Sequence, residues 1–205
     1  MNSPGAEWQD DRVSSSVKVR RGVRADVPAV LGLLDGATEW LVAQGRTDQW
    51  GTEPHSTNPR RIEQINGFVD DAGLWIAELE APGTDAPGID ASGIGARATG
   101  VRAVGALAVG EAMPYVPAAT EPELYVRLLV TDRQLVGHGI GTVLLDHARS
   151  LARAAGVDLL RVDCFGGGDG ALIRYYEKQG FTRAEQFAVQ VNDSEWLGQI
   201  LTQRL

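Results

Sequence analysis

Short segments in which apolar and polar residues alternate are spread along the chain, and this period of two predicts strands. The clearest is ELYVRLLV at 123–130, whose odd and even positions form two distinct faces. Further strands are predicted at 16–21, 74–80, 101–109, 159–164 and 187–191. The segment 196–205 fits a strand or a short helix equally well, because its periodicity does not distinguish them.

Apolar residues three or four positions apart predict helices between these strands. Helices are expected at about 26–43, 60–69, 141–155 and 171–179. Gly156 and Gly180 follow the last two, as glycines at helix C-termini commonly do. The order of strands and helices predicts an α/β protein with one mixed sheet (α+β mixed) and no internal repeat.

The 205 residues suit one domain with a polar tail. The tail, residues 1–15, contains Pro and Gly, has no periodicity and is expected to be flexible. The segment 81–100 is rich in Gly and Pro, and we interpret it as a flexible loop insertion because the flanking strands complete one sheet. A single domain is therefore expected over 16–205.

Composition narrows the class of protein. Hydrophobic residues make up 43% of the chain, enough to bury a core, and the net charge of −8 disfavours nucleic acid as a partner. No apolar run approaches the roughly 18 residues of a membrane span, and the polar start of the chain lacks a secretory signal. Cys164 is the one cysteine, which excludes a disulfide framework and favours a cytoplasmic location.

A glycine-rich segment, GHGIGT at 137–142, lies between a predicted strand and a predicted helix. Glycines let backbone N–H groups approach an anion, and a helix N-terminus adds unpaired donors, so the segment predicts a phosphate site. A turn that only packs tightly explains the motif alone equally well. A P-loop would need a lysine that is absent here, whereas a dinucleotide site stays open because Asp163 lies near the expected strand end.

The segment DGALIRYYEKQGF at 169–181 resembles the closing motif of the GCN5-related N-acetyltransferase (GNAT) family. In that family an Asn, an Ala and a Y-E-K-x-G-F run follow in this order. The glycine segment, with Ile140 and the Leu144-Leu145 pair, is similar to the family's acetyl-CoA pyrophosphate loop. The resemblance covers about 124–191 and implies the GNAT fold, with six or seven strands, four helices and a splay between the central strands.

The resemblance also implies roles for individual residues. Acetyl-CoA would contact Leu128, Leu129, Val130, Gly137, His138, Gly139, Ile140, Gly141, Thr142, Asp169 and Tyr176. Residues 128–130 would offer backbone groups to the pantetheine arm, and 137–142 would hold the pyrophosphate. Tyr176 matches the tyrosine that protonates the leaving thiolate, and the N–H of Val130 or Leu129 would stabilise the oxyanion as a catalytic donor.

The sequence departs from the family pattern at two positions. The family usually has Arg or Gln where Val136 stands, and Gln134 or Arg133 is expected to reach the same space. Asp169 replaces the Asn that hydrogen-bonds the cofactor arm, and an ionised carboxylate has no donor.

The acceptor side is less defined. The general base is expected among Asp163, Glu123, Glu39 and Asp48. Trp40 and Trp50 would form an aromatic wall for an amine whose charge Asp48 attracts. Packing of both tryptophans in the core is an equally good interpretation.

These features predict an N-acetyltransferase that moves the acetyl group of acetyl-CoA to a primary amine of a small molecule or peptide, by direct attack in a ternary complex. A non-catalytic acyl-CoA-binding module and a dinucleotide-binding protein are the alternatives. No metal site is expected, because His55 and His147 are far apart in sequence. Neither nucleic acid nor membrane is expected as a partner, and homodimers are common in the family.

Overall fold

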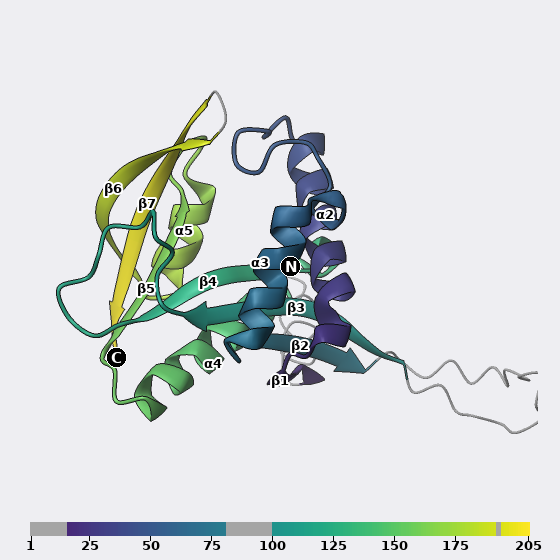
Figure 1. Cartoon of the computed structure of the whole chain (residues 1–205), viewed down its shortest axis with the longest axis horizontal. Coiled ribbons are helices and arrows are strands. Elements are labelled where there is room, and N and C mark those ends of the chain that lie inside the picture. Colours follow the sequence, from purple (N-terminus) through teal and green to yellow (C-terminus); the bar gives the residue numbers. More distant parts are fainter. Residues whose placement is uncertain (1–15, 81–99, 192–193) are drawn as a thin grey trace, which may run out of the picture.

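The computed structural model describes residues 16–80, 100–191 and 194–205, and the predicted tail and nearly all of the predicted insertion lie outside them. Seven strands form one sheet in the order β1-β2-β3-β4-β5-β7-β6 (Figure 1). They are β1 (Lys18–Arg21), β2 (Leu74–Glu80), β3 (Val101–Gly110), β4 (Leu124–Thr131), β5 (Leu159–Phe165), β6 (Thr182–Val191) and β7 (Ser194–Arg204). β4 and β5 are parallel and the other neighbours antiparallel, which confirms the predicted mixed α/β class.

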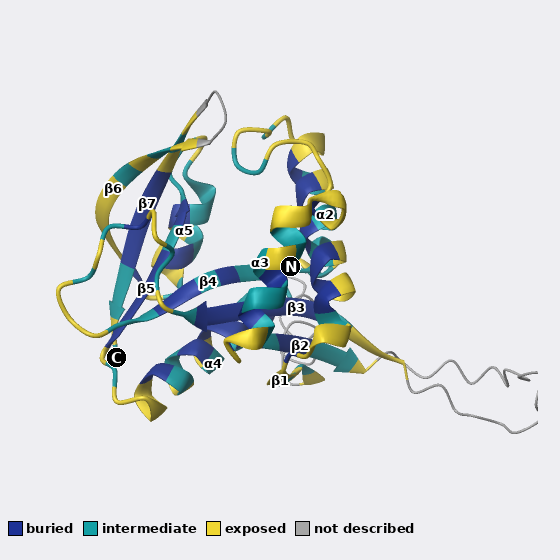
Figure 2. Cartoon of the chain, in the orientation of Figure 1, coloured by how far each residue is buried: buried dark blue, intermediate teal, exposed yellow. Residues whose placement is uncertain are grey.

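Helices cover both faces of the sheet. They are α2 (Val27–Ala43), α3 (Pro59–Asp70), α4 (Ile140–Ala154) and α5 (Ala171–Lys178), with short 3-10 helices η1 (Arg24–Asp26), η2 (His55–Thr57) and η3 (Arg133–Leu135). α2 and α3 pack on one face, and α4 and α5 on the other. Figure 2 shows that the helices turn buried sides towards the sheet and exposed sides away from it.

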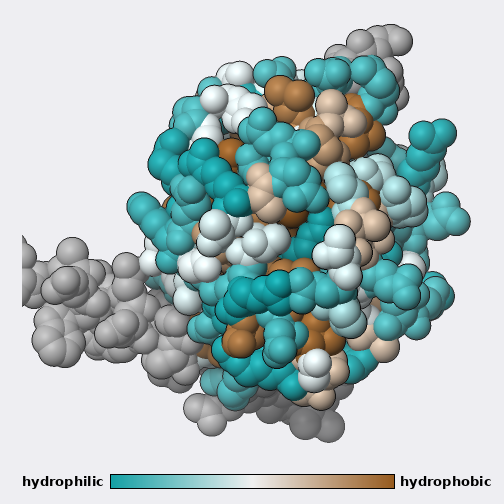
Figure 3. Space-filling model, turned by 90° about the vertical axis from the view of Figure 1, so that its left-hand side faces the viewer, coloured by the Kyte–Doolittle hydropathy of each residue, from teal (hydrophilic) through white to brown (hydrophobic). Residues whose placement is uncertain are grey.

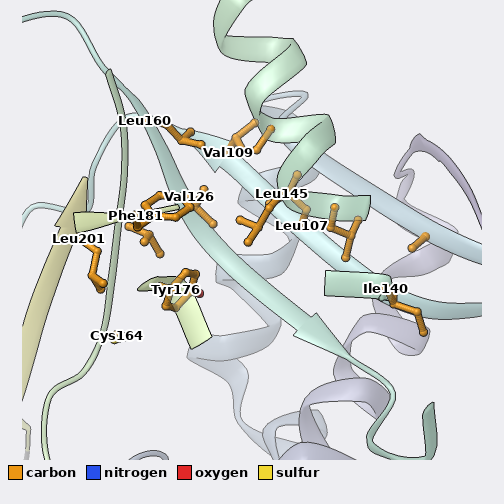
Figure 4. Packing of buried hydrophobic residues seen from close by; sticks show 14 of the residues in the cluster. Leu107, Val109, Val126, Ile140, Leu145, Leu160, Cys164, Tyr176, Phe181 and Leu201 are labelled. Carbon is orange, nitrogen blue, oxygen red and sulfur yellow. The ribbon is translucent and has the colours of Figure 1, made fainter. Parts of the chain in front are cut away.

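The core lies in two layers, one on each side of the sheet. Leu107 on β3, Leu145 on α4 and Leu201 on β7 are fully buried in the layer under α4 and α5 (Figure 4). Ala106 and Ala108 flank Leu107 and pack under α2 and α3 on the opposite face. The side chains of β3 thus alternate between the layers, as the pleat requires.

The central strands β4 and β5 are paired only at their beginnings. Their register runs from Leu124–Leu160 to Val126–Val162, and no later pair joins the two strands. The β3–β4 register skips Arg127, which is therefore a β-bulge. A bulge bends its strand, and beyond it β4 diverges from β5 (Figure 1). The predicted splay is confirmed, and it leaves backbone groups of β4 unpaired along the gap.

The ambiguous segment 196–205 belongs to β7, between β5 and β6. Its neighbours Ile200 and Leu201 are both fully buried, in clusters on opposite faces. A strand covered on both faces loses its alternating pattern, which is why periodicity left the segment undecided. No helix in the described part of the chain is long and apolar enough to cross a membrane.

Candidate active site

The glycine segment 137–142 forms the turn into α4. Gly139 is the N-cap with φ 71°, and Gly137 has φ 91°, conformations that glycine adopts without strain. No side chain caps this end of α4, so N–H groups of the first turn remain available to an anion. A Cβ on Gly137 would meet no atom within 4 Å, so the turn faces open space. This geometry fits a phosphate held by backbone N–H groups.

Side chains of the same segment point elsewhere. Ile140 is buried in the core, and the Thr142 hydroxyl accepts a 3.0 Å hydrogen bond from Gln179 Nε2. The His138 N–H donates to the Leu135 carbonyl at 3.3 Å, so it is already used within the turn. Ile140 can therefore contact an anion only through its backbone, whereas the Thr142 hydroxyl still has its own proton to donate.

Backbone alternation decides which groups of β4 face the gap. The Asp132 N–H donates to the Val104 carbonyl on β3 at 2.8 Å. Because successive N–H groups point to opposite edges of a strand, those of Val130 and Leu128 also face β3. The Leu129 N–H faces the gap. Of the two oxyanion donors expected from the sequence, the alternation favours Leu129 and turns Val130 away.

Tyr176 lies in the gap. Figure 4 shows its side chain between Val126 on β4 and Cys164 on β5. The ring meets those of Tyr175 and Phe181 edge-on, with centroids 5.3 and 5.6 Å away. Burial raises the pKa of the Tyr176 phenol well above its ordinary value, so the hydroxyl is protonated in the resting protein.

The adjacent Tyr175 has a different place. A Cβ built on Gly141 would overlap the Tyr175 hydroxyl oxygen and lie 3.3 Å from its Cζ. The Tyr175 ring therefore packs against the first turn of α4, and burial raises the pKa of Tyr175 to about 12.

This packing predicts the effect of Gly141→Ala. The new methyl group overlaps the Tyr175 hydroxyl, and overpacking of this kind costs about 1–3 kcal/mol, so Tm should fall. Tyr175→Phe removes the oxygen, so the double variant should recover much of the loss. Thermal unfolding of the wild type, both single variants and the double variant measures the coupling. Strictly additive effects would show that the hydroxyl does not contact Gly141.

Asp163 is the first β5 residue beyond the last pair with β4. Its Oδ1 accepts a 2.6 Å hydrogen bond from the hydroxyl of Tyr125, which is fully buried. Burial raises the pKa of Asp163 above its ordinary value, against the opposing effects of Tyr125 and the Arg161 charge. A carboxylate of raised pKa at the gap is suited to accept a proton.

The other carboxylates considered as bases lie in different settings. Glu123 accepts a 3.0 Å hydrogen bond from the guanidinium of buried Arg161, so it serves as a counter-charge. Glu39 and Asp48 are exposed, on α2 and in the connection that follows it. Asp163 is the member of the four that directly follows the point of divergence.

A cavity of about 170 Å³ lies between the connection after α2 and the connection after β5. Its lining residues are Gly45, Arg46, Asp48, Gln49, Phe165, Gly167, Gly168, Asp169, Ala171 and Leu172. Arg46 forms an ion pair with Asp169. Trp196 Nε1 on β7 donates to the Gln49 carbonyl at 3.2 Å. These two contacts join the connection after α2 to the β5–β7 side of the molecule.

Asp169 is engaged within the protein. Its Oδ1 also accepts a 3.0 Å hydrogen bond from the Ala171 N–H in the first turn of α5, and this bond lowers the pKa of Asp169. The carboxylate is exposed and ionised, so it can accept but not donate. The Asn of the family motif can do both.

The predicted aromatic wall is not part of the cavity. The Arg133 guanidinium carbon lies 3.8 Å from the centroid of the Trp40 ring and covers it. Trp50 packs against the core under α2 and α3 and meets the His55 ring at 5.5 Å. Asp48 does line the cavity.

Two side chains of the site were not singled out from the sequence. Phe165 lines the cavity, and its place at the end of a strand before three glycines is a signal that could have identified it. The contact of Tyr125 with Asp163 has no local signal, because it depends on the register of β4 and β5. Within the described ranges no group of three or more His, Cys, Asp and Glu side chains could hold a metal ion.

Comparison with known proteins identifies this arrangement. The profile described as the acetyltransferase (GNAT) family matches residues 49–181. The fold resembles that of a proposed phosphinothricin N-acetyltransferase, with 21% identity and a TM-score of 0.61 over 92% of this chain and 98% of the other. It also resembles a ribosomal-protein-alanine N-acetyltransferase from Brucella melitensis, with 19% identity and a TM-score of 0.57 over 92% of this chain and 99% of the other.

A third structure was solved with acetyl-CoA. It is yncA, a proposed acetyltransferase from Salmonella typhimurium, with 15% identity and a TM-score of 0.57 over 92% of this chain and 94% of the other. No curated protein sequence matches the chain.

Proposed function

Because the chain belongs to the acetyltransferase (GNAT) family, we propose that it transfers the acetyl group of acetyl-CoA to a primary amine of a small molecule or peptide, by direct attack in a ternary complex. One observation carries the proposal: the α4 N-terminus, which no side chain caps, and the Tyr176 phenol both belong to the region opened by the divergence of β4 and β5. The yncA structure, solved with acetyl-CoA, supports this donor.

On the cofactor side, backbone groups do most of the binding. N–H groups at the start of α4 would hold the pyrophosphate, where the helix dipole also favours negative charge. The unpaired edge of β4 would hydrogen-bond the pantetheine arm. Val136 is 59% exposed and offers no charge, so this chain depends on backbone donors more than the family pattern does.

The reacting groups then have defined tasks. Asp163 accepts a proton from the amine, directly or through water, so that the neutral nitrogen attacks the thioester carbonyl. The Leu129 N–H stabilises the negative charge that develops on the carbonyl oxygen. Tyr176 donates its proton to the sulfur as the carbon–sulfur bond breaks. The nitrogen loses its second proton as the amide forms, and a proton taken up through water restores the Tyr176 phenol. The products are the N-acetylated acceptor and free coenzyme A, and Asp163 returns its proton to solvent.

The cavity supports a small acceptor. A volume of about 170 Å³ suits a small molecule or the end of a peptide, and Arg46, Asp48 and Gln49 offer both charges and an amide to polar groups.

The direct test has two parts. Acetyl-CoA should raise the Tm of the protein whereas NAD should not, because a ligand stabilises the fold that binds it. Addition of primary amines should then release free thiol, and mass spectrometry should find the acetylated acceptor. Binding of acetyl-CoA without thiol release for any amine would favour the non-catalytic acyl-CoA-binding module. Val136 and Asp169, which depart from the family pattern, are the residues that suggest this alternative. A shift with NAD alone would overturn the assignment.

A further inference from the structure

Phe165, the last residue of β5, lines the cavity and is held in place by its neighbours. A Cβ built on Gly167 would lie 2.5 Å from Cζ of the Phe165 ring, so the tip of the ring rests on the glycine turn that follows the strand. The ring also contacts that of Trp196 on β7, with centroids 6.1 Å apart. Trp196 is fixed in turn by its hydrogen bond to the Gln49 carbonyl. Phe165 is partly exposed, so its supported ring can be reached from the cavity.

The Phe165 ring begins a row of aromatic rings across the sheet. Trp196 contacts Phe187 on β6 at 6.1 Å between centroids, and Phe187 stacks with Tyr115 of the β3–β4 connection at 6.2 Å. Gly198 pairs with Phe165 on one side and with Phe187 on the other. A Cβ on Gly198 would overlap the rings of Phe187 and Trp196, so the glycine lets both rings lie over the strand. Figure 3 views the molecule from the side of β6, where hydrophobic residues lie in patches among hydrophilic ones.

The row shares its face of the sheet with the proposed base. Asp163 and Phe165 are two residues apart on β5, so the pleat turns both side chains to the same side. Asp163 pairs with Ile200 on β7, which is buried in one cluster with Tyr125, the hydrogen-bond partner of Asp163. Phe187 packs against the same cluster. Two residues of a strand span about 7 Å, which an aromatic ring joined to an amine by a short carbon linker can bridge.

We propose that the Phe165 ring, supported by Trp196, stacks with an aromatic group of the acceptor, so that the substrate class is an aryl-substituted alkylamine whose amine faces Asp163. The inference rests on the proposed function. Aromatic rings gain from offset or edge-on contact with one another beyond the area that they bury. Cavities of about 150 Å³ bind benzene, so the cavity of about 170 Å³ has room for one ring. Asp48, an exposed carboxylate in its lining, attracts the ammonium form of the amine.

The experiment compares 2-phenylethylamine, 2-cyclohexylethylamine and ethylamine, which share the amine and its linker. Initial rates of thiol release give kcat/KM for each. The wild type should use the phenyl compound roughly tenfold or more better than ethylamine, because a group of several apolar carbons is buried. It should use the phenyl compound roughly two- to tenfold better than the cyclohexyl compound, the usual effect of an aromatic pair. Phe165→Leu should bring the phenyl-to-cyclohexyl ratio close to one and leave the KM for acetyl-CoA unchanged.

Trp75→Leu is the matched control. Trp75 on β2 is also a partly exposed aromatic residue, but it packs against the core layer under α4 and α5, on the opposite face of the sheet, so its loss should keep the wild-type ratio. Each ratio is measured within one protein, so partial unfolding of a variant lowers both rates alike and leaves the ratio intact. Equal use of the phenyl compound and either of the other amines by the wild type, an unchanged ratio in Phe165→Leu, or a ratio near one in Trp75→Leu would overturn the proposal.

Failure of the proposed function would be seen separately. If no amine releases thiol, calorimetry with coenzyme A present measures binding of the same amines. Tighter binding of the phenyl than of the cyclohexyl compound to the wild type, but not to Phe165→Leu, would support the aromatic site without catalysis. Equal binding of both compounds, or none, would refute it.

Discussion

Tyr176→Phe is expected to lower the kcat of thiol release by roughly a hundredfold or more, the usual contribution of a positioned general acid. Tyr176 is only 5% exposed, and its phenol is protonated because burial holds its pKa well above the ordinary range. Phenylalanine keeps the ring that packs on Phe181. The KM for acetyl-CoA and Tm should therefore change little, and initial rates with thermal unfolding test all three quantities.

Tyr175→Phe is the control for this experiment. Its hydroxyl contacts Gly141 in the first turn of α4, where the pyrophosphate rather than the thioester would bind, so its loss should leave kcat within a few fold of the wild type. Full activity in Tyr176→Phe, at every pH tested, would remove the proposed acid from the mechanism.

Asp163→Asn is expected to lower activity about as much as Tyr176→Phe. Its distinguishing effect is on the pH dependence of kcat/KM. The proposed base works only when ionised, and burial raises the pKa of Asp163. The kcat/KM of the wild type should therefore fall as pH decreases through that raised pKa. A side-chain amide cannot accept the proton, so the variant should lose about a hundredfold or more at neutral pH and should lack this acidic limb. Tyr125, Arg161, Tyr115, Cys164 and Tyr176 are the charged or titratable groups of the described residues within electrostatic range of the carboxyl.

Stability separates this effect from damage to the fold. A carboxyl whose folded pKa lies above its unfolded value binds more protons when folded, so the free energy of unfolding falls as pH rises between the two values. The amide introduced by Asp163→Asn does not ionise, and its oxygen can still accept the Tyr125 hydrogen bond. The variant should thus be no less stable than the wild type at neutral pH, although it is far less active.

Glu123→Gln should behave in the opposite way. It weakens the partner of the buried Arg161, so Tm should fall while the acidic limb of kcat/KM stays. An acidic limb that survives in Asp163→Asn would assign the base to another residue.

The fold was predictable because its signals are local. Alternation along β4, the glycine that begins α4 and the closing motif around Tyr176 each depend on neighbouring residues. The patterns indicated the element order, and the splay was expected from the family resemblance that the glycine segment and the closing motif carry. The sequence did not identify β7 as a strand, because both of its faces are covered and its residues therefore lack the alternation seen in β4.

The acceptor side was less predictable because long-range contacts build it. The hydrogen bond between Tyr125 and Asp163 depends on the register of two parallel strands. The contact of Arg133 with the Trp40 ring depends on how η3 packs against α2. Neither has a signature in neighbouring residues. The sequence could name Asp163 as one of four carboxylates, but only the structure sets it apart from Glu123, Glu39 and Asp48.

Two polar contacts join the connection after α2 to the other side of the cavity: the Arg46–Asp169 ion pair and the Trp196–Gln49 hydrogen bond. Exposed ion pairs contribute about 0–1 kcal/mol, and a single hydrogen bond about 0.5–1.5 kcal/mol. Thermal fluctuation alone is therefore enough to part both from time to time, with no rearrangement of the sheet. Under the proposed function, acceptor and product would exchange at the cavity when these two contacts part, and the strands would keep their pairing throughout.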